Sequence, residues 1–196
     1  MAPGPRERLL ASAIALMRER GVHATGLSDL LEHSKTARGS IYQHFPGGKS
    51  ELMEQATLRA GQVILQRFER LLADLTPADA VGALIGDWIT ILRATDFAHG
   101  CPILAAAQSG PSEPGIQAAA ATVFEQWSGL IAAALVDRGA PQEHARSLAS
   151  SVVAAVEGAI ARSTAARSTT PLAEVRAILV PLVEQATQHR APTTAS

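Results

Sequence analysis

The chain has 196 residues, of which 47% are hydrophobic and 18% charged, and its formal net charge is −1. This composition predicts a packed globular protein rather than a disordered chain, and the single cysteine, Cys101, excludes an internal disulfide framework and a zinc site built only from cysteines. No uninterrupted apolar run approaches the ~20 residues that a membrane-spanning helix needs, and the first residues lack an apolar signal core, so we expect a cytoplasmic protein.

Helices are favoured over sheets along the whole chain. Alanine, the strongest helix former, supplies 38 residues, and the β-branched and aromatic residues do not cluster into alternating runs. Apolar residues recur at helical spacing in nine segments, which are separated by turn residues. Seven of the expected helices lie at residues 6–20, 37–45, 49–73, 103–108, 116–138, 142–163 and 171–189. The other two are expected to begin directly after a cap at Thr25 and at the cap Thr76-Pro77.

These segments predict an all-α protein of about nine helices. A three-helix bundle at residues 1–48 is joined by a long helix to a larger helical domain, which occupies residues 49–196. Pro181 removes one backbone hydrogen bond inside the last helix and should kink or shorten it. Residues 191–196 are expected to form a loose tail.

The N-terminal bundle has the charge and the element order of a DNA-binding module. The first fifty residues carry a net charge of +3 and the remainder −4, although +3 over fifty residues is also within ordinary variation. A short helix, a three- to four-residue turn and a second short helix match the helix-turn-helix motif, whose second helix lies in the major groove. The same geometry also occurs in proteins that bind no DNA.

The second of these helices has residues suited to DNA on one side. Ile41 and Phe45, four residues apart, form the face that is expected to point inward. Gly39 has no side chain, so the backbone can approach a duplex closely. Arg38, Ser40 and Gln43 can donate hydrogen bonds to base edges, and Tyr42, His44 and Lys49 can reach phosphate oxygens. Lys49 also lies beside the N-terminus of the long helix, whose free amides favour an anion.

Residues 7–53 carry a recognisable pattern. Its members are Thr25, Leu27, Asp29, Leu30, Gly39, Tyr42, His44, Phe45, Lys49 and Leu52. With this pattern the segment resembles the N-terminal domain of the TetR family of bacterial transcription repressors. The string from Arg38 to Lys49, with an extra glycine before the lysine, and the later Gly100-Cys101-Pro102 are similar to the LmrA/YxaF-like branch of that family.

The resemblance implies a DNA-binding head at residues 1–48 and a ligand-binding and dimerisation domain at 49–196. It implies a homodimer, a small-molecule effector, phosphate contacts from Tyr42, His44 and Lys49, and base contacts around Arg38. Gly26 departs from the family, because many members have a hydroxyl residue there that touches phosphate; Thr25 or Ser28 can substitute. The complete predicted DNA interface is Thr25, Ser28, Lys35, Thr36, Arg38, Gly39, Ser40, Tyr42, Gln43, His44 and Lys49.

The larger domain offers a candidate dimer interface and a candidate ligand site. The last two helices are the predicted interface, through Leu148, Val152, Val156, Ile160, Val175, Leu179 and Leu182, although periodicity alone does not distinguish an interface from internal core. The predicted ligand-binding residues are Trp88, Phe97, Gln108, Phe124 and Trp127, each of which is also a reasonable core residue.

Chemistry other than DNA binding has little support. The histidines show no metal-ligand spacing, and no cofactor motif is present, so we predict neither a metal site nor a cofactor. Cys101 lies two residues from His99, but no third catalytic group is evident, and a buried structural cysteine is favoured over a redox-sensing or nucleophilic one.

The sequence therefore predicts a transcriptional regulator and not an enzyme. The leading hypothesis is a homodimeric repressor that a small apolar molecule releases from a near-palindromic operator. The alternative is a helix-turn-helix protein that binds DNA independently of any ligand and whose larger domain only dimerises. A helical enzyme that uses His99 and Cys101 is the least supported hypothesis.

Overall fold

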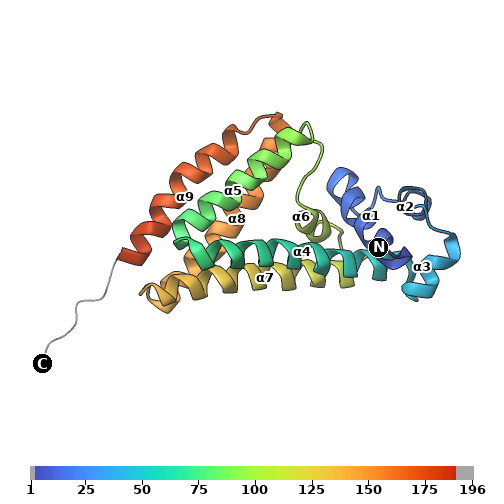
Figure 1. Cartoon of the computed structure of the whole chain (residues 1–196), viewed down its shortest axis with the longest axis horizontal. Helices are drawn as coiled ribbons and strands as arrows, with labels where there is room; N and C mark the ends of the chain where they lie inside the picture. Colours follow the sequence, from blue (N-terminus) through green and yellow to red (C-terminus); the bar gives the residue numbers. More distant parts are fainter. Residues whose placement is uncertain (1–2, 189–196) are drawn as a thin grey trace, which may run out of the picture. The chain divides into compact units, whose positions relative to one another are not determined.

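The computed structural model describes residues 3–188, and within these residues it contains nine α-helices and no strand (Figure 1). The predicted all-α fold is confirmed. The helices are α1 (Pro5–Arg20), α2 (Leu27–Ser34), α3 (Arg38–His44), α4 (Gly48–Asp74), α5 (Pro77–Ala94), α6 (Pro102–Ala107), α7 (Pro114–Asp137), α8 (Gln142–Ala166) and α9 (Thr170–Gln188). The predicted tail at 191–196 lies outside the described residues.

The helices group into two compact units. The first comprises the described residues up to Ile64 together with Ala98–Phe124, so it holds α1, α2, α3, α6 and the N-terminal parts of α4 and α7. The second comprises Leu65–Phe97 and the described residues from Glu125 onward, so it holds α5, α8, α9 and the remaining parts of α4 and α7. These two units are defined by how compactly the chain packs. The predicted domain boundary between residues 48 and 49 is a division by function, and it stays a prediction.

In the first unit, α1, α2 and α3 surround a common apolar core. Removing a large apolar side chain from water stabilises a fold by roughly 1.5–3 kcal/mol. The side chains that are 0% exposed here include Leu9, Leu30, Ile41, Phe45, Leu52 and Met53, which come from α1, α2, α3, the start of α4 and the residue that follows α3. The short helix α3 is therefore held in place from the inside by its apolar face.

The cap of α2 differs from the predicted one. Gly26 is the N-cap residue, and its N–H donates to Asp29 Oδ2 at 2.9 Å, which also places a carboxylate at the positive end of the helix. The Thr25 hydroxyl donates instead to the Gly21 carbonyl at 2.7 Å. The prediction that Thr25 caps α2 is wrong, because its side chain is bonded to the preceding turn.

Main-chain and side-chain hydrogen bonds attach the segment before α6 to the end of α1. The Gly100 N–H donates to the Arg18 carbonyl at 2.9 Å, and Arg18 Nε donates to the Gly100 carbonyl at 3.3 Å. Partial burial lowers the pKa of Arg18 from its usual value, while its electrostatic interaction with Cys101 acts in the opposite direction. These bonds join α1 of the predicted DNA-binding head to a segment outside it.

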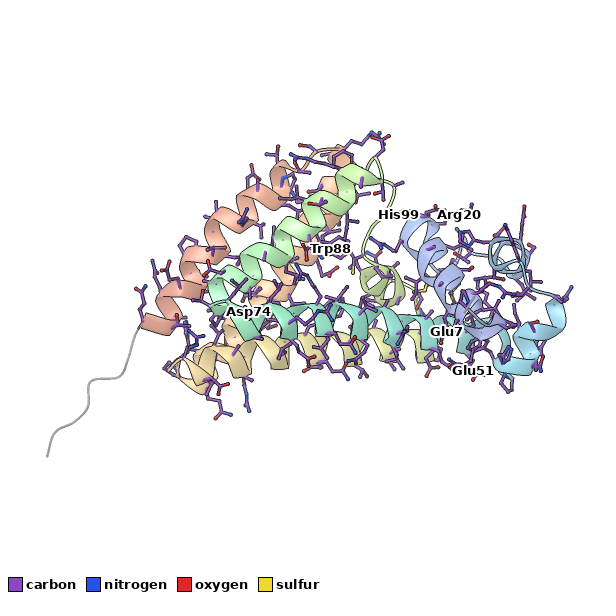
Figure 2. All side chains as sticks on the ribbon, in the orientation of Figure 1. Glu7, Arg20, Glu51, Asp74, Trp88 and His99 are labelled. Atoms are coloured by element: carbon purple, nitrogen blue, oxygen red, sulfur yellow. The ribbon has the colours of Figure 1, made fainter. Side chains whose placement is uncertain are left out.

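Two histidines lie at the same end of α1. His99 Nε2 is 3.5 Å from Glu19 Oε1, and the His23 imidazole contacts the Ser109 carbonyl. Figure 2 shows His99 and Arg20 together at this end of the helix. The segment that contains α6 is thus attached to the end of α1 both before and after the helix.

In the second unit, α5, α8 and α9 lie side by side (Figure 1). The predicted start of α5 is confirmed, because Thr76 is the N-cap, its Oγ1 accepts from the Asp79 N–H at 3.2 Å, and Pro77 follows it. An ion pair joins Arg67 Nε to Asp87 Oδ2 at 2.8 Å, and this hydrogen bond, with the charge of Asp87, raises the pKa of Arg67.

Pro181 lies inside α9 without ending it. The helix continues to Gln188, so Pro181 does not shorten it. Pro181 is exposed, and so is Ala177, the residue four positions earlier whose carbonyl loses its hydrogen-bond donor. Water can therefore replace the hydrogen bond that the proline removes.

α7 is long and apolar enough, by length and composition alone, to cross a membrane. An 18-residue window of this 24-residue helix has a mean hydropathy of 1.4. Its apolar sequence is not an uninterrupted run, because Glu125 and Gln126 lie within it. Core helices of globular proteins meet the same criterion, and Val123, Trp127 and Leu135 of α7 are buried here. One such helix is therefore weak evidence for a membrane.

Candidate nucleic-acid interface

A tight turn joins α2 to α3. Lys35 adopts a left-handed backbone conformation, with φ of 52°, which is uncommon for a residue other than glycine. The hydroxyls of Ser34 and Thr36 are 2.7 Å apart and hydrogen-bonded across this residue. The turn fixes the direction in which α3 leaves α2, and the two helices form the predicted helix-turn-helix.

α3 is anchored on one face and open on the other. Ile41 and Phe45 are 0% exposed, which confirms their predicted inward position, whereas Tyr42 is 53% exposed. The exposed residues of α3 are Arg38, Gly39, Tyr42 and Gln43, and the half-buried ones are Ser40 and His44. The polar residues predicted to contact DNA therefore share one short helix whose opposite face is fixed in the core, but the contacts themselves stay predictions.

The junction between α3 and α4 brings Tyr42 close to the start of α4. Gly48 has φ of 70°, and a Cβ there would lie 3.5 Å from Tyr42 Cε1. Glu51, in the first turn of α4 (Figure 2), accepts a hydrogen bond from the Gly47 N–H at 2.7 Å. One amide at this helix end is therefore already bonded within the chain, so a phosphate here would depend more on the half-buried Lys49.

The remaining predicted DNA-binding residues differ in accessibility. Thr25 is 0% exposed and hydrogen-bonded internally, whereas Ser28 is exposed in the first turn of α2. Ser28 is therefore the better candidate for the phosphate contact that Gly26 lacks. Lys35 is exposed and Thr36 half-buried in the turn.

The sequence did not indicate which residue covers Phe45, the buried residue that follows α3. The Arg6 guanidinium lies over the Phe45 ring, 5.4 Å from its centroid, and Arg6 also hydrogen-bonds Gln55 of α4. A cation over an aromatic face is attractive, by about 0.5–1 kcal/mol at exposed sites. Arg6 thus joins α1 and α4 across Phe45, a contact between residues too distant in sequence for a spacing argument to find.

Gly39→Ala is expected to raise the stability of the free protein and to weaken DNA binding. A Cβ at Gly39 would meet no heavy atom within 4 Å in the described structure, so alanine fits and favours the helix by up to about 1 kcal/mol. The added methyl would instead obstruct a duplex that approaches the α3 backbone, lowering operator affinity by roughly tenfold. Thermal denaturation and fluorescence anisotropy with a labelled duplex measure the two effects; unchanged or tighter DNA binding would contradict the close approach.

Two family models match this chain. The model of bacterial regulatory proteins of the tetR family matches residues 9–56, which contain the helix-turn-helix. The model described as the C-terminal domain of LmrA/YxaF-like transcriptional regulators matches residues 77–178, more than half of the chain. The chain belongs to the TetR family of transcriptional regulators. The expected branch is confirmed as well.

Relatives and solved structures agree with this membership. A helix-turn-helix-type transcriptional regulator of Mycobacterium tuberculosis is 39% identical over 175 residues, which cover 86% of this chain and 89% of the relative. The regulator LmrA of Bacillus subtilis is 29% identical over 183 residues, covering 92% and 97%. The crystal structure of a TetR transcriptional regulator from Legionella pneumophila matches the fold with a TM-score of 0.79 at 22% identity, covering 94% of this chain and 97% of that one.

These matches define the coarse function. The matched families and relatives are DNA-binding transcriptional regulators rather than enzymes, so this TetR-family protein is a DNA-binding transcriptional regulator. The hypothesis of a helical enzyme that uses His99 and Cys101 is excluded on this ground.

Most residues of the predicted dimer interface lie inside the second unit. Leu148, Val152, Val156, Ile160 and Leu179 are between 0% and 8% exposed, Val175 is half-buried and Leu182 is 41% exposed. The five buried residues have almost no surface left to lose on dimerisation. α8 and α9 stay the predicted interface helices, but other residues occupy their outer faces.

The predicted ligand-binding residues are divided between the two units. Trp88, Phe97 and Trp127 belong to the second unit, whereas Gln108 and Phe124 belong to the first. Trp88 and Trp127 are buried, at 5% and 8% exposure. The ligand site itself stays a prediction.

Glu157 of α8 is a buried carboxylate that sequence reasoning did not single out. It is 7% exposed, on the same face of the helix as the apolar core residues.

Cys101 is also buried, at 3% exposure, as expected of a structural cysteine, and its redox role stays untested. Among residues 3–188, no group of three or more His, Cys, Asp or Glu side chains is arranged to hold a metal ion.

Proposed function

We propose that this protein is a homodimeric, ligand-responsive repressor that acts in the cytoplasm. The observation that carries this proposal is α3, whose Ile41 and Phe45 are fixed in the core while Arg38, Gly39 and Gln43 are exposed. In a TetR-family regulator this helix is suited to enter the major groove, with phosphate contacts from Tyr42 and the other predicted residues beside it. Two such helices in a dimer would read the two halves of a near-palindromic operator.

The outer faces of α8 and α9 support the homodimer. One exposed stripe of α8 consists only of small residues, and α9 exposes two large apolar ones. The stripe is Ser147, Ser151, Ala154, Gly158, Ala161 and Ala165, and the α9 residues are Ile178, at 68% exposure, and Leu182, at 41%. Small side chains let a second helix approach closely, and exposed apolar side chains favour burial against a partner.

The effector is proposed to act from the larger domain. Residues 77–178 match the C-terminal domain of LmrA/YxaF-like regulators, and the second unit contains two buried tryptophans suited to an apolar ligand. Such a ligand changes DNA binding only if its affinity differs between the DNA-bound and the free conformation. The protein is therefore expected to repress transcription while it is bound to its operator, and to leave the operator when the ligand binds.

The proposal predicts the behaviour of two phosphate-contact variants. A duplex selected from a random pool by the wild-type protein is expected to contain a near-palindrome. Tyr42→Phe and Lys49→Ala should weaken binding to all duplexes alike, and Lys49→Ala should reduce the slope of log affinity against log salt by about 1. Fluorescence anisotropy at several salt concentrations measures this slope.

Two results would contradict the proposed function. Unchanged affinity in both variants would remove Tyr42 and Lys49 from the interface. A reporter gene placed behind the selected duplex should be transcribed less when the protein is present, so a rise in transcription would contradict the role of repressor.

A further inference from the structure

Gly61 is a glycine in the interior of a long helix. It lies in the middle of α4 and is buried. Glycine destabilises a helix interior relative to alanine, so a buried interior glycine needs a local reason. Its position is five residues beyond the DNA-binding family match, which ends at residue 56.

The local reason is a close approach of α7. A Cβ built at Gly61 would lie 2.6 Å from Val123 Cγ1 and 3.1 Å from Val123 Cβ, and closer still to Val123 Cγ2. Real Cβ atoms essentially never approach other heavy atoms within 3.0 Å. α4 and α7 can therefore keep their present spacing only while residue 61 has no side chain.

A second close approach between the two helices lies seven residues earlier on α4, where the neighbouring atom is the end of a flexible side chain. A Cβ at Gly115 of α7 would lie 2.8 Å from Glu54 Oε2 of α4. Residue 54 faces 115 and residue 61 faces 123, so the two helices run in the same direction with two close contacts between them. All four residues and α3 belong to the first unit.

The position of α4 at Gly61 is coupled to the position of α3. Thirteen residues of continuous helix, ~20 Å, separate Gly61 from Gly48, and Gly48 lies against Tyr42 of α3. A methyl group at Gly61 would separate α4 from Val123 by roughly 1 Å, because carbon atoms pack at about 3.5–4.0 Å. Because α4 is one continuous helix from Gly48 onward, moving it at Gly61 would also change the position of its first turn, which lies against Tyr42.

We propose that Gly61 is a positioning residue for DNA binding, which sets the place of α3 through its contact with Val123. Val123 lies within the match to the C-terminal family domain, so this contact connects that domain to the recognition helix. The inference rests on the proposed DNA contacts of α3. Hydrogen bonds to bases and phosphates weaken steeply with distance and angle, so a shift of this size is sufficient to reduce affinity.

The test compares single and double substitutions on a duplex selected by the wild-type protein. Gly61→Ala should lower affinity for this duplex by about fivefold or more, with the folded state retained. Val123→Ala removes the methyl groups that the new Cβ would meet. The double variant Gly61→Ala/Val123→Ala should therefore return to within about twofold of wild-type affinity. Fluorescence anisotropy gives the affinities, and thermal denaturation reports folding.

Gly86→Ala is the matched control. Gly86 also lies in a helix interior, but a Cβ there would meet nothing within 4 Å, so this variant should bind the duplex as the wild type does. The proposal is overturned if Gly61→Ala retains wild-type affinity or if Val123→Ala fails to restore it. If Gly61→Ala does not fold, the double variant alone tests the proposal. A double variant that fails to fold or to bind the duplex would overturn the proposal, because the defect would then not come from the contact with the Val123 methyl groups. Failure of the wild-type protein to bind any duplex would instead overturn the proposed function.

Discussion

Gly158→Arg is expected to separate the proposed homodimer and to lower operator affinity at least about 100-fold, because the two heads would no longer bind as one linked ligand. Gly158 is exposed on α8, and a Cβ there would meet no heavy atom within 4 Å, so the substitution leaves the core of the protomer intact. Its neighbours on the stripe, Ala154 and Ala161, have only a methyl group as side chain. An arginine in this stripe would keep the partner helix at a distance and bury a charge in the interface.

Gly129→Arg is the control for this substitution. Gly129 is likewise exposed in a helix interior with open space around it, but it lies on α7, in a groove with Ala133 and Arg146. Light scattering after size-exclusion chromatography should find a monomer for Gly158→Arg and a dimer for Gly129→Arg, both with wild-type helix content. A dimeric Gly158→Arg together with a monomeric Gly129→Arg would place the dimer interface at the groove between α7 and α8. A dimeric Gly158→Arg by itself would exclude the α8 stripe from the dimer interface.

Local signals in the sequence predicted the elements that local interactions determine. Thr76 and Pro77 start α5 as expected, because a capping hydroxyl and a proline at the first helical position act within a single turn. The inward position of Ile41 and Phe45 followed from their spacing. The start of α7 was expected two residues too late, because Pro114 was counted in a loop although proline also fits the first turn of a helix.

Features that depend on contacts distant in sequence were not predictable. Spacing gave Val152 and Ile160 an inward face but could not decide whether that face meets the same chain or a partner; the structure buries both within the chain. Gly61 is a glycine inside the expected helix at 49–73, but its role could not be predicted, because that role depends on Val123, 62 positions later in the chain. The exposed small residues of α8 indicate an interface only once the opposite face of the helix is known to be buried within the same chain.

Arg38→Ala is expected to relax sequence specificity at one position of each half-site. Arg38 is the first residue of α3, exposed and beside Gly39, where a guanidinium can donate two hydrogen bonds to a guanine edge. Loss of such a bidentate contact reduces discrimination between the preferred base and its replacements by about 1–3 kcal/mol. Affinities for a set of duplexes, each with one base pair changed, measure this discrimination position by position.

The pattern of losses distinguishes base readout from simple charge removal. If Arg38 reads a base, the affinity of Arg38→Ala falls most on the preferred duplex, and the penalty for a mismatch at one position disappears while the other mismatch penalties remain. Arg59→Ala removes the same charge from an exposed position on α4 and should leave every mismatch penalty in place. An equal loss on all duplexes in Arg38→Ala would assign Arg38 to phosphate contact, and base recognition would then depend on Ser40 and Gln43.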